Sequence, residues 1–161
     1  MLFKSFSSND FEFKNYIDCS MQEHEKILHW RNEDNIRKWM NNQNLISFED
    51  HLKFVQSLIR CEDKAYYAIF KNDMYIASFY ITDIFGDSCE RGLFVIPSHQ
   101  GKGQTMILEK IFLEYICRKG LKTIKAKVKI DNIRSNRYHL KYGYKEIGRD
   151  ESFVFYNLKL N

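Results

Sequence analysis

The chain has 161 residues, 44% of them hydrophobic and 29% charged, which indicates one globular domain and excludes an intrinsically disordered chain. No apolar run approaches the ~18 residues of a membrane span, and the first ten residues lack the apolar core of a signal peptide. The four cysteines form no C-x-x-C pair, which argues against zinc and for reduced thiols. We expect one cytoplasmic domain over residues 1–161 that binds neither a metal nor a membrane.

Charge is unevenly distributed along the chain. Residues 1–100 carry 11 basic and 15 acidic side chains, whereas residues 101–161 carry 14 basic and 6 acidic ones. A basic second half suits a polyanionic ligand. It would also suit nucleic acid, but the basic residues are interleaved with apolar core positions and form no long basic arm. We therefore expect a phosphate-bearing small molecule and no nucleic acid.

Helix-start signals divide the first half of the chain. Ser20 and Glu23 form a capping box, which predicts a helix beginning there. Ser47 repeats the signal ahead of a stretch with one apolar face. The predicted elements are a strand over residues 11–17, a helix from 20 to about 31, a short helix over 34–40, a helix from 47 whose apolar face extends to 59, and two strands over 65–71 and 74–82 joined by a tight turn at 72–73.

The clearest motif is a strand, a glycine loop and a helix between residues 88 and 119. The strand over residues 91–96 ends at Pro97, the only proline of the chain. A loop over residues 99–103 follows, and apolar residues at helical spacing then extend to Arg118. Such a loop exposes backbone N–H groups at the positive end of a helix dipole, which favours anions and above all phosphates.

The spacing within the loop narrows the choice of phosphate ligand. A Walker motif needs Gly-Lys-Ser/Thr, and a dinucleotide fingerprint needs three glycines, of which only Gly101 and Gly103 are present. The loop fits instead the pattern Q/R-x-x-G-x-G/A. Gln100 is its first residue, and Thr105 stands at its end, where a small residue is usual.

The last part of the chain adds a strand, a helix and a closing pair of strands. Residues 122–130 alternate strictly between apolar side chains and polar ones, mostly lysines, which is the cleanest strand pattern in the sequence. Asp131-Asn132 precedes a helix that ends at Tyr142-Gly143. Residues 144–149 and 153–160 indicate an antiparallel pair. The whole order predicts an α/β layer with a mixed sheet.

Two motifs of the second half resemble one family. The loop, after the strand end Val95-Ile96-Pro97, resembles the acetyl-CoA loop of the GCN5-related N-acetyltransferases (GNAT). Residues 132–144 resemble the N-x-x-A-x-x-L-Y-x-K-x-G-F segment of that family, and the predicted element order is the GNAT order. The resemblance implies the GNAT fold, with a mixed central sheet of about six to seven strands flanked by about four helices, and acetyl-CoA as cofactor.

The first half resembles a narrower group, the nucleotide-sugar N-acetyltransferases of pseudaminic acid biosynthesis, which serve flagellin glycosylation. This resemblance rests on Trp30-Arg31-Asn32, Trp39-Met40 and residues 46–54, with support from residues 89–93 and 101–104. It implies direct transfer of acetyl from acetyl-CoA to the 4-amino group of a UDP-linked 4-amino-4,6-dideoxy sugar, without an acetyl-cysteine. The alternatives are a protein N-terminal or lysine acetyltransferase and a non-catalytic acyl-CoA-binding module.

For the cofactor, backbone amides of the loop are expected to hold the pyrophosphate, with Lys102 adding charge. The backbone of residues 93–95 would pair with the pantetheine arm like an added strand, and the Val95 N–H would stabilise the oxyanion. The resemblance places Asn132 against the pantetheine and Arg134 or Arg137 near the nucleotide. The expected cofactor-binding residues are Leu93, Val95, Gln100, Gly101, Lys102, Gly103, Gln104, Thr105, Asn132, Arg134 and Arg137.

For the chemistry, Glu90 is the candidate general base, acting through water or with a raised pKa, because a free Glu has a pKa near ~4.3. A neutral amino sugar would need no strong base. The family tyrosine that protonates the thiolate falls at position 139, which holds His139, and Tyr138 lies one residue earlier. One step along a helix turns a side chain by ~100°, so only one of them can face the sulfur. Position favours His139, with Tyr138 as the rival.

For the acceptor, Arg31 and His51 are candidates to grip the nucleotide diphosphate, since His51 lies in the first turn of its helix, where the dipole favours anions. Trp39, Met40 and Phe54 would form an apolar wall for the 6-deoxy methyl group. Convergence of Arg31 and His51 on the acceptor would argue against a peptide substrate. The expected partner is a small nucleotide sugar, and a homodimer is an arrangement that the sequence leaves open.

Overall fold

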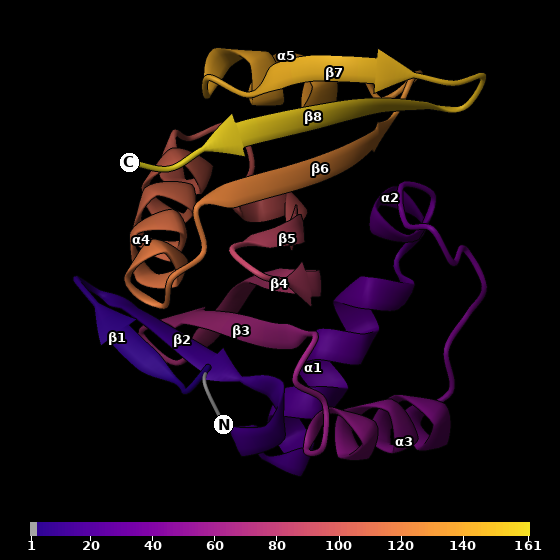
Figure 1. The fold of residues 1–161 in the computed structure, drawn as a ribbon. Coiled ribbons are helices and arrows are strands. Elements are labelled where there is room, and N and C mark those ends of the chain that lie inside the picture. The colour runs from indigo at the N-terminus through magenta and orange to yellow at the C-terminus, as the bar shows by residue number, and fades with distance from the viewer. Residues whose placement is uncertain (1–2) are drawn as a thin grey trace.

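Eight β-strands form one mixed sheet through the part of the chain that the structure describes, residues 3–161 (Figure 1). In this computed structural model the strands are β1 (Phe6–Ser8), β2 (Phe11–Asn15), β3 (Ala65–Lys71), β4 (Met74–Phe85), β5 (Ser88–Val95), β6 (Thr123–Lys129), β7 (Lys145–Arg149) and β8 (Phe153–Lys159). Their spatial order is β1-β2-β3-β4-β5-β6-β8-β7. Only β5 and β6 run parallel to each other; every other neighbouring pair is antiparallel.

Helices cover both faces of this sheet (Figure 1). They are α1 (Met21–Asn32), α2 (Asp34–Arg37), α3 (Phe48–Leu58), α4 (Gln104–Arg118) and α5 (Ile133–Lys141), with 3-10 turns at Tyr16–Asp18 and Pro97–His99. The predicted capping box begins α1, because Ser20 accepts a hydrogen bond from the Glu23 N–H and the Glu23 carboxylate accepts one from the Ser20 N–H. This reciprocal pair satisfies two donors that would otherwise lack partners.

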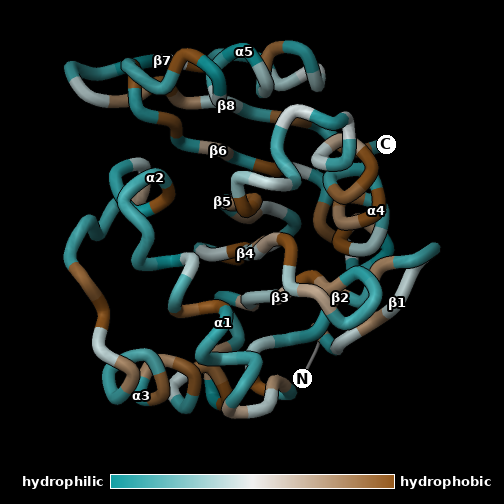
Figure 2. Tube along the Cα trace, turned by 180° about the vertical axis from the view of Figure 1, so that it is seen from behind, coloured by the Kyte–Doolittle hydropathy of each residue, from teal (hydrophilic) through white to brown (hydrophobic). Residues whose placement is uncertain are grey.

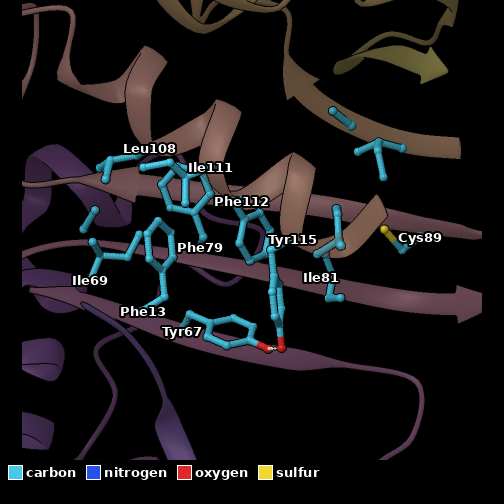
Figure 3. Close-up of a cluster of buried hydrophobic side chains, with 14 of the residues drawn as sticks. Phe13, Tyr67, Ile69, Phe79, Ile81, Cys89, Leu108, Ile111, Phe112 and Tyr115 are labelled. Carbon is cyan, nitrogen blue, oxygen red and sulfur yellow. Dashed lines mark hydrogen bonds between the residues drawn. The ribbon is translucent and has the colours of Figure 1, made fainter. Parts of the chain in front are cut away.

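The larger core lies between the sheet and α4 (Figure 3). Phe112 of α4 packs on Phe13 and Phe79, with ring centroids 6.3 and 5.3 Å apart, and hydrophobic residues along α4 are brown in Figure 2. A second core under α1 and α3 includes Phe94 of β5, whereas its neighbour Val95 belongs to the first core. β5 serves both cores because successive side chains of a strand point to opposite faces.

β5 and β6 pair only where they begin. The parallel register joins residues 88–90 to residues 123–125, whereas β4 pairs with β5 as far as Val95 and β6 pairs with β8 along its whole length. Beyond Glu90 the two central strands therefore diverge. The second half of β5 has one edge without a neighbouring strand, and the candidate site lies there.

The predicted α/β class with a mixed sheet is confirmed. Residues 3–161 contain eight strands and five α-helices, where the family resemblance implied about six to seven strands and about four helices. The additional strand, β1, has three residues and is too short to show a period of two. The strand predicted over residues 11–17 ends at Asn15, whose side chain accepts from the Ile17 N–H and turns the chain. The short helix predicted over residues 34–40 ends at Arg37. No helix within residues 3–161 is long and apolar enough to cross a membrane.

Candidate active site

The free edge of β5 presents backbone N–H and C=O groups to the gap between β5 and β6. The Ile96 N–H donates to the Ile76 carbonyl at 3.0 Å, and the hydrogen-bonding side alternates along an antiparallel strand. Phe94, two residues earlier, therefore turns its N–H and C=O toward β4. Leu93 and Val95 turn theirs the other way, so their N–H groups face the gap that β6 leaves.

Side chains from distant parts of the sequence enclose a cavity of about 270 Å³ at this gap. It brings cofactor, catalytic and acceptor candidates together. The predicted residues that line it are Trp39, Met40, Leu93, Val95, Gln100, Thr105, Asn132, Arg134, Tyr138 and His139. The predicted residues outside its lining are Arg31, His51, Phe54, Glu90, Gly101, Lys102, Gly103, Gln104 and Arg137.

The loop before α4 leaves backbone donors open. Gly101 and Gly103 have φ values of +76° and +72°, which favour glycine, and Gly103 precedes α4 without a side-chain cap. Within residues 3–161, no backbone acceptor bonds the N–H groups of residues 101–105. These groups lie at the positive end of a 15-residue helix, which is an arrangement that binds phosphate.

Gln100 connects this loop to β5 and to α5. Its amide nitrogen donates to the Val95 carbonyl at 2.7 Å, and its amide oxygen accepts from Arg134 Nη1 at 2.7 Å. Arg134 Nη2 lies 3.9 Å from the place that a Cβ on Gly101 would take. The guanidinium group therefore lies beside the open N–H groups and adds a full positive charge to the anion site.

Asn132 caps α5 and borders the cavity. Its side-chain oxygen accepts from the Ser135 N–H at 3.1 Å, which leaves its amide NH₂ group for a ligand. Arg137 is exposed and lies outside the cavity lining. The open loop donors, the free β5 edge and Arg134 together fit a ligand with a diphosphate at one end and an extended, amide-bearing arm.

His139 is buried, and its single ring proton is already used in a hydrogen bond. Its Nδ1 lies 2.7 Å from the Ser135 carbonyl, which can only accept, so Nδ1 carries the proton. Nε2 is buried and has no hydrogen-bond partner in the described chain. Burial, together with Arg91, lowers the pKa of His139 to about 3. At neutral pH the ring is uncharged, and the remaining nitrogen is an acceptor with no proton to give.

Tyr138 lines the cavity beside His139 and retains a proton. Its hydroxyl donates to Glu109 Oε2 at 3.2 Å, and its ring lies against Tyr142 with centroids 4.3 Å apart. Burial and the adjacent Glu109 carboxylate raise the pKa of Tyr138 well above its ordinary value. Of the two acid candidates, Tyr138 is therefore the one with a proton available at neutral pH.

A buried ion pair that sequence reasoning missed lies behind Tyr138. Arg91 Nη2 and Glu109 Oε1 are 2.7 Å apart, and their side chains are 2% and 1% exposed. The Tyr144 hydroxyl accepts from Arg91 Nη2 and donates to Glu109 Oε1, each at 2.9 Å. Burial opposes the Arg91 charge, but Glu109 and Tyr144 hold the pKa of Arg91 above its ordinary value. The sequence signal for this ion pair was the presence of two charged residues, Arg91 and Glu109, at positions of an apolar strand and an apolar helix face that point into the core.

Glu90 lies where β5 and β6 part. It pairs with Thr82 on one side and Lys125 on the other, and it is half-buried. Burial, followed by the nearby Asp83 carboxylate, raises the pKa of Glu90, which is the direction that a carboxylate base needs. Because Glu90 does not line the cavity, it would reach an amine there through a water molecule.

The apolar acceptor candidates divide between the cavity and the second core. Trp39 and Met40 line the cavity. Phe54 packs on Tyr66, with ring centroids 5.0 Å apart. Tyr66 in turn stacks on Tyr80 at 4.9 Å, and Tyr80 is a cavity residue that sequence reasoning missed. Phe54 therefore supports the cavity wall through two aromatic rings and does not form it.

Arg31 and His51 have different environments. His51 is 4% exposed, and its Nε2 lies 3.0 Å from His24 Nδ1. Burial, followed by His24, lowers the pKa of His51 to about 4, so the ring is neutral at pH 7. Arg31 Nη2 donates to the Asn42 carbonyl at 2.6 Å, and its Nη1 is buried without a partner in residues 3–161. The first turn of α3 favours an anion, but packing against α1 buries the imidazole.

Comparison with known proteins decides the family. Residues 16–145 match the family model described as the acetyltransferase (GNAT) domain. The chain belongs to the GNAT acetyltransferase family. Its sequence-based assignment to that family, and the fold that the assignment implied, are confirmed.

Individual GNAT proteins resemble this chain over almost its whole length. Acetyltransferase PseH from two strains of Campylobacter jejuni is 29% and 30% identical over 150 and 148 residues, which cover 92% of this chain and 93% of each relative. The crystal structure of Campylobacter jejuni PseH in complex with acetyl coenzyme A has a TM-score of 0.76 at 26% identity, covering 94% of this chain and 99% of that one. These relatives confirm the predicted enzyme class, an N-acetyltransferase.

A more distant GNAT structure shows the fold alone. Spermidine N-acetyltransferase from Vibrio cholerae, solved in complex with CoA and spermine, has a TM-score of 0.82 at 17% identity, covering 94% of this chain and 96% of that one. A higher TM-score thus accompanies a lower identity. The backbone is shared among GNAT enzymes with different acceptors, so the substrate must be argued from side chains.

Proposed function

We propose that this GNAT enzyme transfers acetyl from acetyl-CoA to the 4-amino group of a UDP-linked 4-amino-4,6-dideoxy sugar, the reaction of the pseudaminic acid pathway. The observation that carries the proposal is the free edge of β5 beside the open N–H groups before α4. The similarity to PseH over 92% of the chain supports the choice of acceptor. The four free cysteines suit a reducing compartment, and we place the reaction in the cytoplasm.

The cofactor site follows the strand edge and the loop. When bound, acetyl-CoA supplies an acetyl thioester that an amine can attack. The N–H groups of residues 101–105 and the Arg134 guanidinium bind the diphosphate, and Lys102 adds charge at the exposed rim. Leu93 and Val95 pair with the pantetheine arm as an added strand would, and the Asn132 amide supports the same arm.

Val95 provides the donor for the developing oxyanion. Its carbonyl is bonded to the Gln100 side chain, whereas its N–H faces the cavity. A fixed backbone donor costs no reorganisation when negative charge appears on the acetyl oxygen, and such a donor is worth roughly 10²–10³ in rate. Gln100 thus positions Val95, beside the acetyl group, and also Arg134, beside the diphosphate, because its side chain bonds both residues.

Two proton movements complete the transfer. Glu90, through a water molecule, accepts the proton that the amine loses as the C–N bond forms. Tyr138 gives its hydroxyl proton to the sulfur as the C–S bond breaks. Position in the helix favoured His139 for the second role, but the Nδ1–H bond to Ser135 and the pKa of about 3 favour Tyr138. We assign His139 to holding Tyr138 beside the cavity.

The acceptor sugar would lie against Trp39 and Met40, two of the apolar residues that line the cavity, which follow α2 in the chain. Arg31 remains the candidate for the nucleotide diphosphate, because its Nη1 has no protein partner in the described chain. Phe54 supports the Tyr80 side of the cavity through Tyr66, whereas His51 bonds His24 outside the cavity lining.

One assay tests the proposed function. The protein is incubated with acetyl-CoA and a panel of UDP-amino sugars, beside basic peptides and peptides with free N-termini, and released thiol is followed. We expect thiol release with a UDP-4-amino-4,6-dideoxy sugar and none with peptides. Acetylated peptide with inert sugars would establish a protein acetyltransferase instead. Tight acetyl-CoA binding without turnover on any amine would establish a binding module.

A further inference from the structure

We propose that Glu109, together with Arg91, is a positioning residue that holds the Tyr138 hydroxyl and its proton for the leaving-group step. This inference rests on the proposed function, because it takes Tyr138 as the proton donor to the sulfur. Glu109 lies in the middle of the apolar face of α4, between the buried residues Leu108 and Ile111. A carboxylate at that place needs partners for both of its oxygens.

The two oxygens of Glu109 have separate partners. Oε1 accepts hydrogen bonds from Arg91 Nη2 at 2.7 Å and from the Tyr144 hydroxyl at 2.9 Å. Oε2 accepts a hydrogen bond from the Tyr138 hydroxyl at 3.2 Å. The ion pair with Arg91 therefore uses only Oε1 of Glu109. The other oxygen, Oε2, bonds Tyr138, which lines the cavity. Glu109 itself lies outside the cavity lining and acts through Tyr138.

Stability alone explains this arrangement poorly. Two charges taken out of water lose hydration free energy that their mutual attraction restores only with very good geometry, and apolar residues of similar volume are often as stable or more so. Arg91 and Glu109 are nevertheless more than nine-tenths buried; Arg91 lines the cavity, and Glu109 lies behind it. A fully satisfied polar network fixes side-chain orientation, and here the orientation that it fixes is that of Tyr138.

The electrostatic surroundings of Tyr138 come from four parts of the chain. α4 contributes Glu109 and β5 contributes Arg91, while α5 contributes His139, followed by Tyr142 and Tyr144 at its end. His139 is neutral. Lys127 and Lys129 of β6 and Arg134 of α5 line the same cavity, but the charged groups that act most on the Tyr138 pKa are Glu109 and Arg91. Glu109 raises the pKa of Tyr138 and Arg91 lowers it. Glu109 keeps the proton on Tyr138 until a thiolate forms, and Arg91 stabilises the phenolate that remains.

The proton balance of the step is complete. The amine nitrogen bonds to the acetyl carbon, and the electron pair of the C–S bond leaves with sulfur. The Tyr138 proton moves to that sulfur, and the phenolate recovers a proton from the ammonium formed by the attack, by way of water and Glu90. The amine thus loses one proton and the thiol gains one, with no oxidant or other reagent required.

Glu109→Gln tests the inference, with Tyr144→Phe as its control. Tyr144 contacts the same ion pair but not Tyr138, so its loss weakens the network without changing the partner of Tyr138. In Glu109→Gln we expect kcat to fall at least about tenfold, while KM for acetyl-CoA stays within about twofold. The alkaline limb of the kcat–pH profile should move to lower pH, because the carboxylate that raises the Tyr138 pKa is gone. Tyr144→Phe should lower the melting temperature, reduce kcat much less than Glu109→Gln does, and leave the alkaline limb in place.

Two further variants keep the test decisive. In a Tyr138→Phe background, Glu109→Gln should cause no additional loss of kcat, since it acts through the missing hydroxyl. If Glu109→Gln does not fold, Glu109→Asp preserves the charge beside Arg91 and withdraws the carboxylate from Tyr138, and kcat should again fall. A folded Glu109 variant with unchanged kcat and an unmoved alkaline limb would overturn the inference, and so would an equal kcat loss in Tyr144→Phe. Thiol release by the wild type on a different amine would refute the sugar substrate alone, and the same variants would then be measured on that amine.

Discussion

Gly92 leaves the space that the Tyr80 ring occupies. The two residues pair across β4 and β5, and a Cβ on Gly92 would lie 2.2 Å from the Tyr80 ring carbons. Tyr80 thereby reaches the cavity and stacks on Tyr66. A glycine within an apolar strand, which normally weakens the strand, here permits a close approach of a side chain.

Gly92→Ala should therefore destabilise the protein and impair the cavity. Tyr80 would have to leave its place beside Tyr66, and overpacking of this kind costs about 1–3 kcal/mol of unfolding free energy. Chemical denaturation measures this loss, and KM for the acceptor amine should rise. Gly148→Ala is the control, because a Cβ there meets nothing within 4 Å. Equal stability of the two variants would contradict the close approach.

Arg134→Ala should weaken acetyl-CoA binding. The guanidinium lies beside the loop that holds open N–H groups, and a charge-assisted contact to a phosphate contributes about 1.5–3 kcal/mol. We expect the dissociation constant of coenzyme A, measured by calorimetry, to rise at least about tenfold. The increase should be smaller at high salt, because salt screens the charge of Arg134. Arg60→Ala, an exposed arginine after α3, is the charge-matched control. Arg137→Ala should have a smaller effect than Arg134→Ala, and the reverse order would move the nucleotide end to Arg137.

Tyr138→Phe should lower kcat by about 10²-fold or more, as expected for loss of a general acid. His139→Phe should act mainly on stability, because His139 stacks on Tyr156 and bonds the Ser135 carbonyl. Steady-state kinetics and thermal melts of the two variants separate these outcomes. A strong loss of kcat in His139→Phe, with Tyr138→Phe nearly unchanged, would return the acid role to His139.

Stability should fall as the pH drops from about 6.5 toward about 4. Burial lowers the pKa of His24, His51 and His139 in the folded chain, to about 4 for His51 and about 3 for His139. The unfolded chain, with an ordinary histidine pKa near 6.5, therefore binds more protons in this window. Each such histidine contributes a slope of up to about 1.4 kcal/mol per pH unit, and none above pH 6.5.

Denaturant unfolding at pH 7, 6 and 5 measures this slope. His51→Gln should make it shallower, because one of the three buried imidazoles, those of His24, His51 and His139, is removed. His29→Gln is the matched control, since the His29 side chain is 62% exposed and should leave the slope unchanged. Identical slopes for wild type and His51→Gln would show that the buried pair does not govern acid stability.

The elements that depend on neighbours within a few residues were determined by the sequence alone. The capping signals at Ser20 and Ser47 and the alternation of β6 each predicted their element correctly. The glycine loop before α4 was predicted as an anion site, and its N–H groups are indeed open. Such features are local because a cap or a strand period is set by adjacent side chains and backbone groups.

The protonation and exposure of the site residues were decided only by the tertiary structure. Tyr138 meets Glu109 across 29 positions of sequence, His51 meets His24 across 27, and Arg91 meets Glu109 across 18. The family position favoured His139 as the acid, and its place in the first turn of a helix favoured His51 as an anion ligand. Packing withdrew both rings from water and left them neutral. A pKa depends on desolvation and on charges brought close by folding, and neither quantity exists until the sheet and its helices have packed together.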